Sequence, residues 1–455
     1  MILFYLSTLS YIAATPLNLQ DVFDEGSGQT VHVGLTRQYS AKSIMLETRN
    51  ATLIGMASDA RLDLEAQPSP AFHLVNSTLK LSNLEIVPSL LSPFAEAVDH
   101  SHLTIEQCTY ATLNFTHPIL LGDQSTLVLS SMTFDLVTFH SSLIAQVIAA
   151  INPTISISLH FCSFTNSAVA AQSPIVAGAD VARISITDST FLNISCPSQP
   201  TMPLEPVNGT SSRHVEIFDS RFNKVEGPLA GGIVFGIQAH SLHLRSVKMS
   251  DCSNSVHFWG RVPFPASTAV TISRCSVTQA TTTSFQPNGS FLFFVGSAVS
   301  LNITSCSFSH CTARQSGGCV WMTTSESIDL FRCRVSNCSA GGNGGFLCCS
   351  ESTTNASLRN NTFSSCSADG NGGALFVSGL TAFSESWGNY SLCTADESGG
   401  ALALQVEDAV QLSFTKVDFV RNLASSLLGN DVSITYSLVL TRPRGSNPPM
   451  RHQEH

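Results

Sequence analysis

The sequence predicts an all-β protein that folds as a single parallel β-helix, a solenoid of about thirteen stacked coils with a short N-terminal cap. Three observations predict this fold. A short motif recurs at a nearly constant period, apolar residues alternate within each repeat, and a pair of glycines follows each late motif at a fixed distance. A period of this size with alternation inside it indicates stacked units rather than a globular domain.

The repeat is clearest between Leu301 and Leu404, where it is written four times with steps of 27, 28 and 27 residues. The copies begin at Cys306, Cys333, Asn361 and Gly388, a position that we call p. An aromatic or apolar residue stands at p+2, a cysteine at p+5 and the second glycine at p+12. The second glycines are Gly318, Gly345, Gly373 and Gly400.

Apolar residues at p−5, p−3 and p+2 extend the frame outward from these four copies. The rule finds thirteen units with steps of 24 to 31 residues, from the unit with p at Leu84 to the unit with p at Thr415. Glu385 breaks it, because it falls at p−3 where an apolar residue is expected. About 27 residues make one circuit of short strands and turns, and stacking such circuits buries their apolar side. A leucine-rich repeat would show helical periodicity, and a propeller blade is longer, so neither alternative fits.

The motif Phe363-x-x-Cys366 followed by Gly372-Gly-Ala-Leu375 resembles the repeats of chlamydial polymorphic outer membrane proteins. More broadly, the chain resembles the pectin-lyase-like superfamily. The match is good over residues 300 to 430 and is a pattern match before that. The resemblance implies a right-handed parallel β-helix displayed at a surface.

The composition of its segments divides the chain into four parts. Residues 1–15 form an uncharged apolar run ending in small residues, which predicts a signal peptide and hence a secreted or cell-surface protein. Residues 16–73 are assigned to the cap and first coils, with a short helix over 17–24, residues 74–440 to the β-helix, and 441–455 to a disordered tail. No other segment is long and apolar enough to span a membrane. With charged residues at 12%, a net charge of −10 and no basic patch in the sequence, no nucleic-acid partner is expected.

Ten Asn-x-Ser/Thr sequons are candidates for N-glycosylation, although a polar surface enriches the same residues without any modification. They are Asn50, Asn76, Asn114, Asn193, Asn208, Asn288, Asn302, Asn355, Asn360 and Asn389.

Cysteines recur in step with the coils. Two stand at p, Cys306 and Cys333, and four at p+5, Cys311, Cys338, Cys366 and Cys393. Equivalent Cα atoms of stacked coils lie about 4.8 Å apart, a separation that a disulfide can span. Bridges such as Cys311–Cys338 or Cys366–Cys393 are expected in an oxidising compartment, and a column of reduced, packed thiols is the alternative.

The double glycines predict a tight backbone corner, beside which Ser316, Asn343, Asn371 and Ser398 form a polar ladder. One constellation suggests catalysis. Asp188 and Asp219 occupy p−1 on adjacent coils, and Arg274 occupies p−1 two coils later. Superfamily lyases use calcium on stacked carboxylates with an Arg or Lys base, so these residues resemble such a site; a solvated polar face is the other interpretation.

The sequence therefore favours a non-catalytic, adhesin-like or structural protein that binds glycans or cell-surface molecules and needs no cofactor or metal. The alternative is a calcium-dependent polysaccharide lyase or a glycoside hydrolase. A catalyst needs a compact cluster of non-repeating charged residues, and the sequence shows mostly the repeat.

Overall fold

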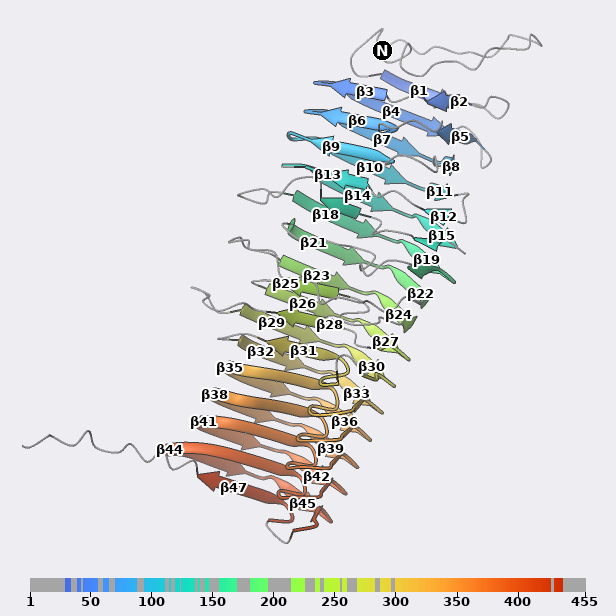
Figure 1. Ribbon diagram of the computed structural model, residues 1–455. Helices are drawn as coiled ribbons and strands as arrows, with labels where there is room; N and C mark the ends of the chain where they lie inside the picture. The colour runs from blue at the N-terminus through green and yellow to red at the C-terminus, as the bar shows by residue number, and fades with distance from the viewer. Residues whose placement is uncertain are drawn as a thin grey trace, which may run out of the picture.

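The chain is a parallel β-solenoid without helices in the described residues (Figure 1). The computed structural model describes residues 29–33, 39–41, 44–55, 60–64, 70–87, 94–110, 114–115, 119–122, 124–135, 138–139, 144–146, 155–169, 181–194, 214–225, 234–237, 241–253, 256–259, 268–282, 287–295, 299–426 and 429–436. The predicted signal peptide, the helix over 17–24 and the tail from 441 lie outside these residues. The described residues contain no helix long and apolar enough to cross a membrane.

Every recorded strand pair is parallel, and each strand pairs with its equivalent one coil before and one coil after. The stack has three faces along its length (Figure 1). The third face contains one short strand per coil and is a fifteen-stranded sheet, so the prediction of thirteen coils is low by two. The two extra coils lie at the N-terminal end, within the range that was assigned to the cap and first coils. There the spacing is irregular and the p−5, p−3 rule does not extend.

The third face begins directly after p in each coil. Its strands are β2 (Tyr39–Ala41), β5 (Arg61–Leu64), β8 (Glu85–Val87), β11 (Thr109–Tyr110), β15 (Thr133–Asp135), β19 (Ser163–Thr165), β22 (Thr190–Ile194), β24 (Arg221–Val225), β27 (Lys248–Ser250), β30 (Ser276–Thr278), β33 (Ser307–Ser309), β36 (Arg334–Ser336), β39 (Thr362–Ser364), β42 (Asn389–Ser391) and β45 (Asp418–Val420).

The second face precedes p in each coil. Its strands are β1 (Gln29–Val33), β4 (Asn50–Gly55), β7 (Thr78–Ser82), β10 (His102–Glu106), β14 (Thr126–Ser130), β18 (Ile155–His160), β21 (Val181–Thr187), β23 (His214–Phe218), β26 (Ser241–Arg245), β29 (Thr268–Ser273) and β32 (Val299–Thr304). Four long strands then run through from the first face to the second. They are β35 (Val320–Phe331), β38 (Leu347–Arg359), β41 (Leu375–Ser386) and β44 (Leu402–Thr415).

The first face and the connecting turns hold the remaining strands. On the first face are β3 (Ile44–Glu47), β6 (Phe72–Val75), β9 (Ala95–Val98), β13 (Ile119–Leu121), β17 (Ile144–Gln146), β25 (Val234–Ile237), β28 (Val256–Trp259), β31 (Leu292–Val295) and β47 (Val432–Tyr436). The turn strands are β12 (Asn114–Phe115), β16 (Thr138–Phe139), β20 (Ala168–Val169), β34 (Thr312–Ala313), β37 (Ser339–Ala340), β40 (Ser367–Ala368), β43 (Thr394–Ala395) and β46 (Leu423–Ala424).

A left-handed residue at p−1 turns the chain from the second face to the third. Thirteen such residues, from Asn83 to Lys416, have φ between 49° and 58°. Where p is serine or cysteine, its side chain donates a hydrogen bond to the carbonyl oxygen at p−2, as Ser189 Oγ does to Thr187 O at 2.8 Å and Cys306 Sγ to Thr304 O at 3.3 Å. Serine and cysteine recur at p because they satisfy this carbonyl inside the buried corner.

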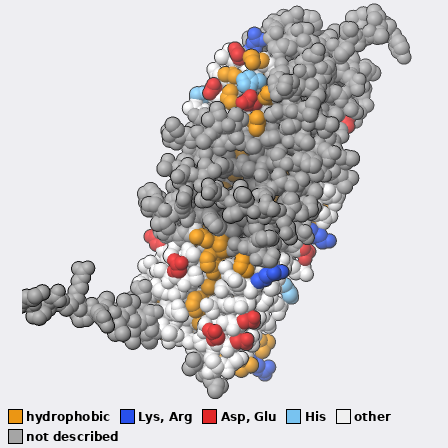
Figure 2. All heavy atoms as spheres, viewed as in Figure 1, with side chains coloured by type: hydrophobic (Ala, Val, Ile, Leu, Met, Phe, Trp, Pro, Cys, Tyr) orange, Lys and Arg blue, Asp and Glu red, His pale blue; other side chains and the backbone are white. Residues whose placement is uncertain are grey.

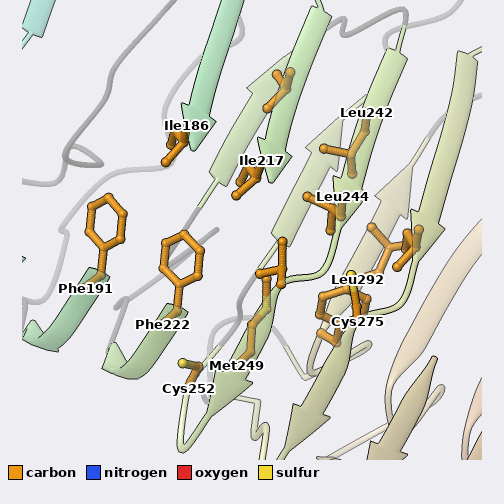
Figure 3. Packing of buried hydrophobic residues seen from close by; sticks show 14 of the residues in the cluster. Ile186, Phe191, Ile217, Phe222, Leu242, Leu244, Met249, Cys252, Cys275 and Leu292 are labelled. Carbon is orange, nitrogen blue, oxygen red and sulfur yellow. The ribbon is translucent and has the colours of Figure 1, made fainter. Parts of the chain in front are cut away.

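Inward side chains of equivalent position stack along the axis and form one continuous core. Phe134, Phe164, Phe191 and Phe222 are nearly parallel, with ring centroids 4.6 to 4.8 Å apart. Figure 3 shows Phe191 and Phe222 side by side, with Met249 taking the equivalent place in the next coil. The alternation of apolar and polar residues in the sequence therefore corresponds to columns of stacked inward side chains. Each side chain is buried by the coils on both sides.

The last unit of the predicted frame is displaced by two residues. Asp418 pairs with Asn389 and Phe419 with Tyr390, so p is Val417 rather than Thr415. A slip of two keeps every side chain on the same side of a strand, so alternation alone does not detect it. The left-handed residue Lys416, with φ 53°, fixes the correct frame.

The two glycines of each pair perform different tasks. The first is left-handed, as Gly344 is with φ 68°, while the second lies against the backbone of the next coil. A Cβ on Gly345 would stand 2.1 Å from the carbonyl oxygen of Gly373. The late coils thus turn at a place where only glycine permits both the conformation and the approach.

Candidate functional site

The three residues that suggested catalysis do lie on one corner, the p−1 corner between the second and third faces. Asp188, Asp219 and Arg274 are exposed there and have φ of 49°, 50° and 54°. Asp219 Oδ2 lies 4.0 Å from Arg245 Nη2, so it faces a cation of the next coil. No group of three or more metal-ligating side chains occurs among the residues that the structure describes.

This corner carries most of the positive charge of the described C-terminal half. Eight of the chain's 22 lysines and arginines stand at p−2, p−1 or p+1 between the coil with p at Ser220 and the last coil. All eight side chains are exposed. We call this set the basic corner: Arg221, Arg245, Lys248, Arg274, Arg332, Arg334, Arg359 and Lys416.

Strand register aligns these cations in rows along the axis. At p−2, Phe218 pairs with Arg245, and Phe331 pairs with Arg359. At p+1, Arg221 pairs directly with Lys248. Like charges on paired strands repel one another, so the Arg221–Lys248 pair reduces stability rather than adding to it. Charge pairing between coils therefore does not explain why these two cations are neighbours.

Aromatic rings interleave with the cations at the same corner. The Cζ atom of Arg245 lies 4.6 Å from the centroid of the Phe218 ring. Arg332 and Arg359, from successive coils, both lie over Phe331, at 4.7 and 5.3 Å. Such contacts contribute about 0.5–1 kcal/mol each at exposed sites.

A fourth cation–aromatic contact lies at the C-terminal end of the corner. Lys416 Nζ lies 3.8 Å from the centroid of the Trp387 ring, and Trp387 is 56% exposed. Within the described residues, an ion pair is recorded for one member of the basic corner, Arg245. Of the other seven cations, three lie over aromatic rings: Arg332, Arg359 and Lys416.

Sequence reasoning missed the basic corner because it grouped charged residues by the frame only for Asp188, Asp219 and Arg274, and looked for basic patches along the chain. The members are spread over residues 221 to 416, and the p frame alone brings them together. Grouping the charged residues by their position relative to p would have found them.

A second outward feature lies on the first face of the late coils. Phe293, Trp321, Cys348, Phe376 and Ala403 are in register on successive strands, and Trp321 stacks on Phe293 at 4.7 Å. Figure 2 shows hydrophobic side chains in a narrow column over these strands. All but Trp321 are at most 6% exposed, so the row mainly packs against itself.

The predicted polar ladder borders this row and is fully used in holding the turns together. Asn288 Oδ1 accepts from Ser316 N at 2.8 Å, Ser316 Oγ from Asn343 N at 3.1 Å, and Asn343 Oδ1 from Asn371 N at 2.8 Å. Each side chain therefore caps the backbone of the following coil. The first face of the late coils is explained by stacking and needs no ligand.

The cysteines of the described coils are all buried free thiols in this structure. Those at p+5 donate weakly to the carbonyl at p+3, as Cys311 Sγ does to Ser309 O and Cys393 Sγ to Ser391 O. Hydrogen bonding to Cys319, together with burial, raises the pKa of Cys311, and burial raises the pKa of Cys162 and Cys252 to about 11. Bridging between neighbouring coils remains a prediction.

We expect the native thiols to react slowly with iodoacetamide at neutral pH, because protonated, buried thiols are poor nucleophiles. Denaturation without reductant should then expose them to rapid alkylation, which mass spectrometry would read residue by residue. Thiols that stay unlabelled after denaturation would identify the bridged pairs. Fast labelling of the native protein would contradict the buried column.

One acidic side chain lies inside the stack. Glu385 pairs in register with Leu358 of the preceding coil and is 2% exposed, so the frame holds at the residue that breaks its apolar rule. Tyr390 Oη donates to both of its carboxylate oxygens, at 3.0 and 2.8 Å. Burial raises the pKa of Glu385 to about 8.

The glycine at p in this coil makes room for that carboxylate. A Cβ on Gly388 would stand 2.2 Å from Glu385 Oε1. Glu385 is therefore accommodated within a single coil, because Gly388 leaves space for its carboxyl group and Tyr390 donates a hydrogen bond to it. Its enclosure makes it a structural feature rather than a group that meets substrate.

Seven of the ten glycosylation candidates are exposed and one, Asn288, is partly buried. The exposed ones are Asn50, Asn76, Asn193, Asn302, Asn355, Asn360 and Asn389. Asn208 and the side chain of Asn114 lie outside the described part.

Comparison with known proteins gives matches in solved structures alone: no protein-family model and no curated protein matches the sequence. Tailspike protein 3 of bacteriophage CBA120 is 13% identical, with a TM-score of 0.38 over 95% of this chain, and the chain spans 62% of the tailspike's length. A PL6 alginate lyase in complex with a trisaccharide is 10% identical, with a TM-score of 0.31, covering 91% of this chain and 84% of the lyase.

A third similar structure is the family 28 exopolygalacturonase of Yersinia enterocolitica. It is 10% identical with a TM-score of 0.29, and the match covers 88% of this chain and 74% of the enzyme. The identification of this chain as a parallel β-solenoid rests on its own strand pairing, coil by coil.

Proposed function

We propose that this protein is a non-catalytic glycan-binding solenoid, secreted or displayed at a cell surface, and that the basic corner is its binding site. The observation that carries the proposal is the recurrence of three cation–aromatic groups at one corner of the stack, at Phe218, Phe331 and Trp387. Aromatic rings and fixed hydrogen-bond donors together are what polar, ring-shaped ligands require of a binding surface.

The distribution of ionisable groups supports binding rather than catalysis. A general acid or base works best with a pKa tuned towards neutrality and within reach of the substrate. In the described residues the carboxyl group tuned in this way is Glu385, which is enclosed in the core. A polysaccharide lyase or glycoside hydrolase remains the alternative, and it would have to use Asp188, Asp219 and Arg274.

An array of immobilised glycans tests the proposal, with the Trp387→Ser variant beside the wild type. We expect wild-type binding to at least one glycan class and a loss of about tenfold in Trp387→Ser, since an exposed aromatic contact in a binding site typically contributes more than about 1 kcal/mol.

Phe161→Ser is the matched control, because Phe161 also occupies p−1, has φ 52° and is 63% exposed, but lies outside the basic corner. It should bind as the wild type does. Equal losses in both variants, or no binding to any glycan, would count against the proposal.

A further inference from the structure

The basic corner is positively charged, whereas the molecule as a whole has a negative net charge. The chain has a net charge of −10, yet between Phe218 and Asp418 the positions p−2, p−1 and p+1 hold eight cations and two carboxylates, Asp219 and Asp418. A positive strip on an acidic body focuses an attractive potential for anions along one line and repels them elsewhere.

Two guanidinium groups converge on one ring at the middle of this strip. Arg332 and Arg359 come from successive coils, and both lie over Phe331, with Cζ atoms 4.7 and 5.3 Å from its centroid. Arg334, one strand position beyond p on the same coil as Arg332, adds a third exposed cation. A guanidinium that packs on a ring rather than on a carboxylate still has N–H groups to donate.

This arrangement suits a particular kind of anion. A carboxylate presents two oxygens in one plane and is matched by the fork of a single arginine. A sulfate ester presents three oxygens in different directions, so it can accept from arginines of two coils at once. We infer that the basic corner binds a linear sulfated glycan lying along the solenoid axis, with Arg332 and Arg359 sharing one sulfate ester.

The spacing of the coils agrees with this ligand. Successive coils advance by about 4.8 Å, comparable to the length of one pyranose unit in an extended polysaccharide. Cations spaced along the axis would thus meet substituents of successive or alternate sugars. Single- or double-stranded nucleic acid fits less well, because its dense phosphates, about one per 1.7 Å of duplex axis, would extend over the acidic body on both sides of the strip.

This inference rests on the proposed function and specifies its ligand class. The test is equilibrium binding of the full chain to four probes at several salt concentrations. The probes are a heparin-derived oligosaccharide, the same oligosaccharide after desulfation, an oligogalacturonate of equal length, and a single-stranded DNA oligonucleotide. We expect the sulfated probe to bind at least tenfold more tightly than each of the others, with an affinity that falls as salt rises.

The variant that tests the site is Arg332→Gln with Arg359→Gln. Each lost guanidinium should weaken binding of the sulfated probe about tenfold, so the pair should lose about a hundredfold. The control with the same change of charge is Arg314→Gln with Arg421→Gln, two exposed arginines outside the basic corner. It should stay within about threefold of the wild type, because remote exposed charges are largely screened.

The outcomes separate this inference from the proposed function. Equal binding of the desulfated or uronate probe, or equal losses in the two double variants, would overturn the sulfated-glycan inference and leave glycan binding standing. DNA bound as tightly as the sulfated glycan would overturn it in favour of a general polyanion site. Absence of binding to every glycan would overturn both.

Discussion

Gly345→Ala is expected to lower the free energy of unfolding by about 3 kcal/mol or more. The added methyl group would clash with backbone atoms, which cannot rotate away as a side chain can. The added Cβ would meet the carbonyl oxygen of Gly373 at 2.1 Å and that of Ser367 at 2.5 Å. Those atoms belong to the next coil, so relief requires the coils to separate and weakens the hydrogen bond from Gly345 N to Gly372 O. Denaturant unfolding followed by circular dichroism measures the effect.

Gly342→Ala serves as the control for this prediction. Its Cβ would meet the Ser316 hydroxyl at 2.7 Å, a side-chain atom that can rotate away with loss of the hydrogen bond from Asn343 N, and Gly342 has no positive φ. The expected loss is about 1 kcal/mol, the net contribution of one hydrogen bond. If both variants were equally stable, the close approach of coils at the second glycine would be wrong.

Glu385 should make the last coils less stable as the pH rises. Its pKa is raised from 4.5 to about 8 by burial, so the folded state holds the proton more tightly than the unfolded state does. The stabilisation is fully present below pH 4.5 and is lost as the pH rises to about 8. The contribution to the slope is about 1.4 kcal/mol per pH unit across that window.

Glu385→Gln isolates this effect, because glutamine keeps a carbonyl acceptor for Tyr390 and cannot ionise. We expect the free energy of unfolding of the wild type to fall more steeply than that of Glu385→Gln between pH 5 and 8. The difference should level off above the folded pKa. Parallel pH profiles for the two proteins would show that the carboxyl group is not enclosed as the structure places it.

The repeat could be predicted from the sequence because each coil states it independently. A column such as Phe134, Phe164, Phe191 and Phe222 requires an apolar or aromatic residue at p+2 in every coil. The alternation of apolar and polar residues then shows which side chains face the core. The predicted positions of p were wrong or missing where the repeat becomes irregular or where the pattern fits two alignments equally well. The slip of two at Val417 preserves alternation, and the two N-terminal coils lack the regular spacing.

Glu385 and the basic corner show what a pattern of residue types leaves out. An acid at an inward position contradicts the apolar rule until Gly388 and Tyr390 are recognised as its space and its donor. Arg332 and Arg359 are 27 residues apart and are joined by a ring from one coil's strand. Both arrangements depend on how the coils stack in three dimensions. In the sequence, the arginines look like ordinary surface residues and Glu385 looks like an exception to the repeat.

The measurement that most directly tests binding without cleavage is the size distribution of a bound polysaccharide after long incubation with the protein. Chain length should stay unchanged, with or without calcium, for pectate, alginate and whichever glycan binds the array. Calcium-dependent release of unsaturated fragments, lost in a variant with Asp188→Ala and Asp219→Ala, would contradict the account and establish a lyase at the same corner.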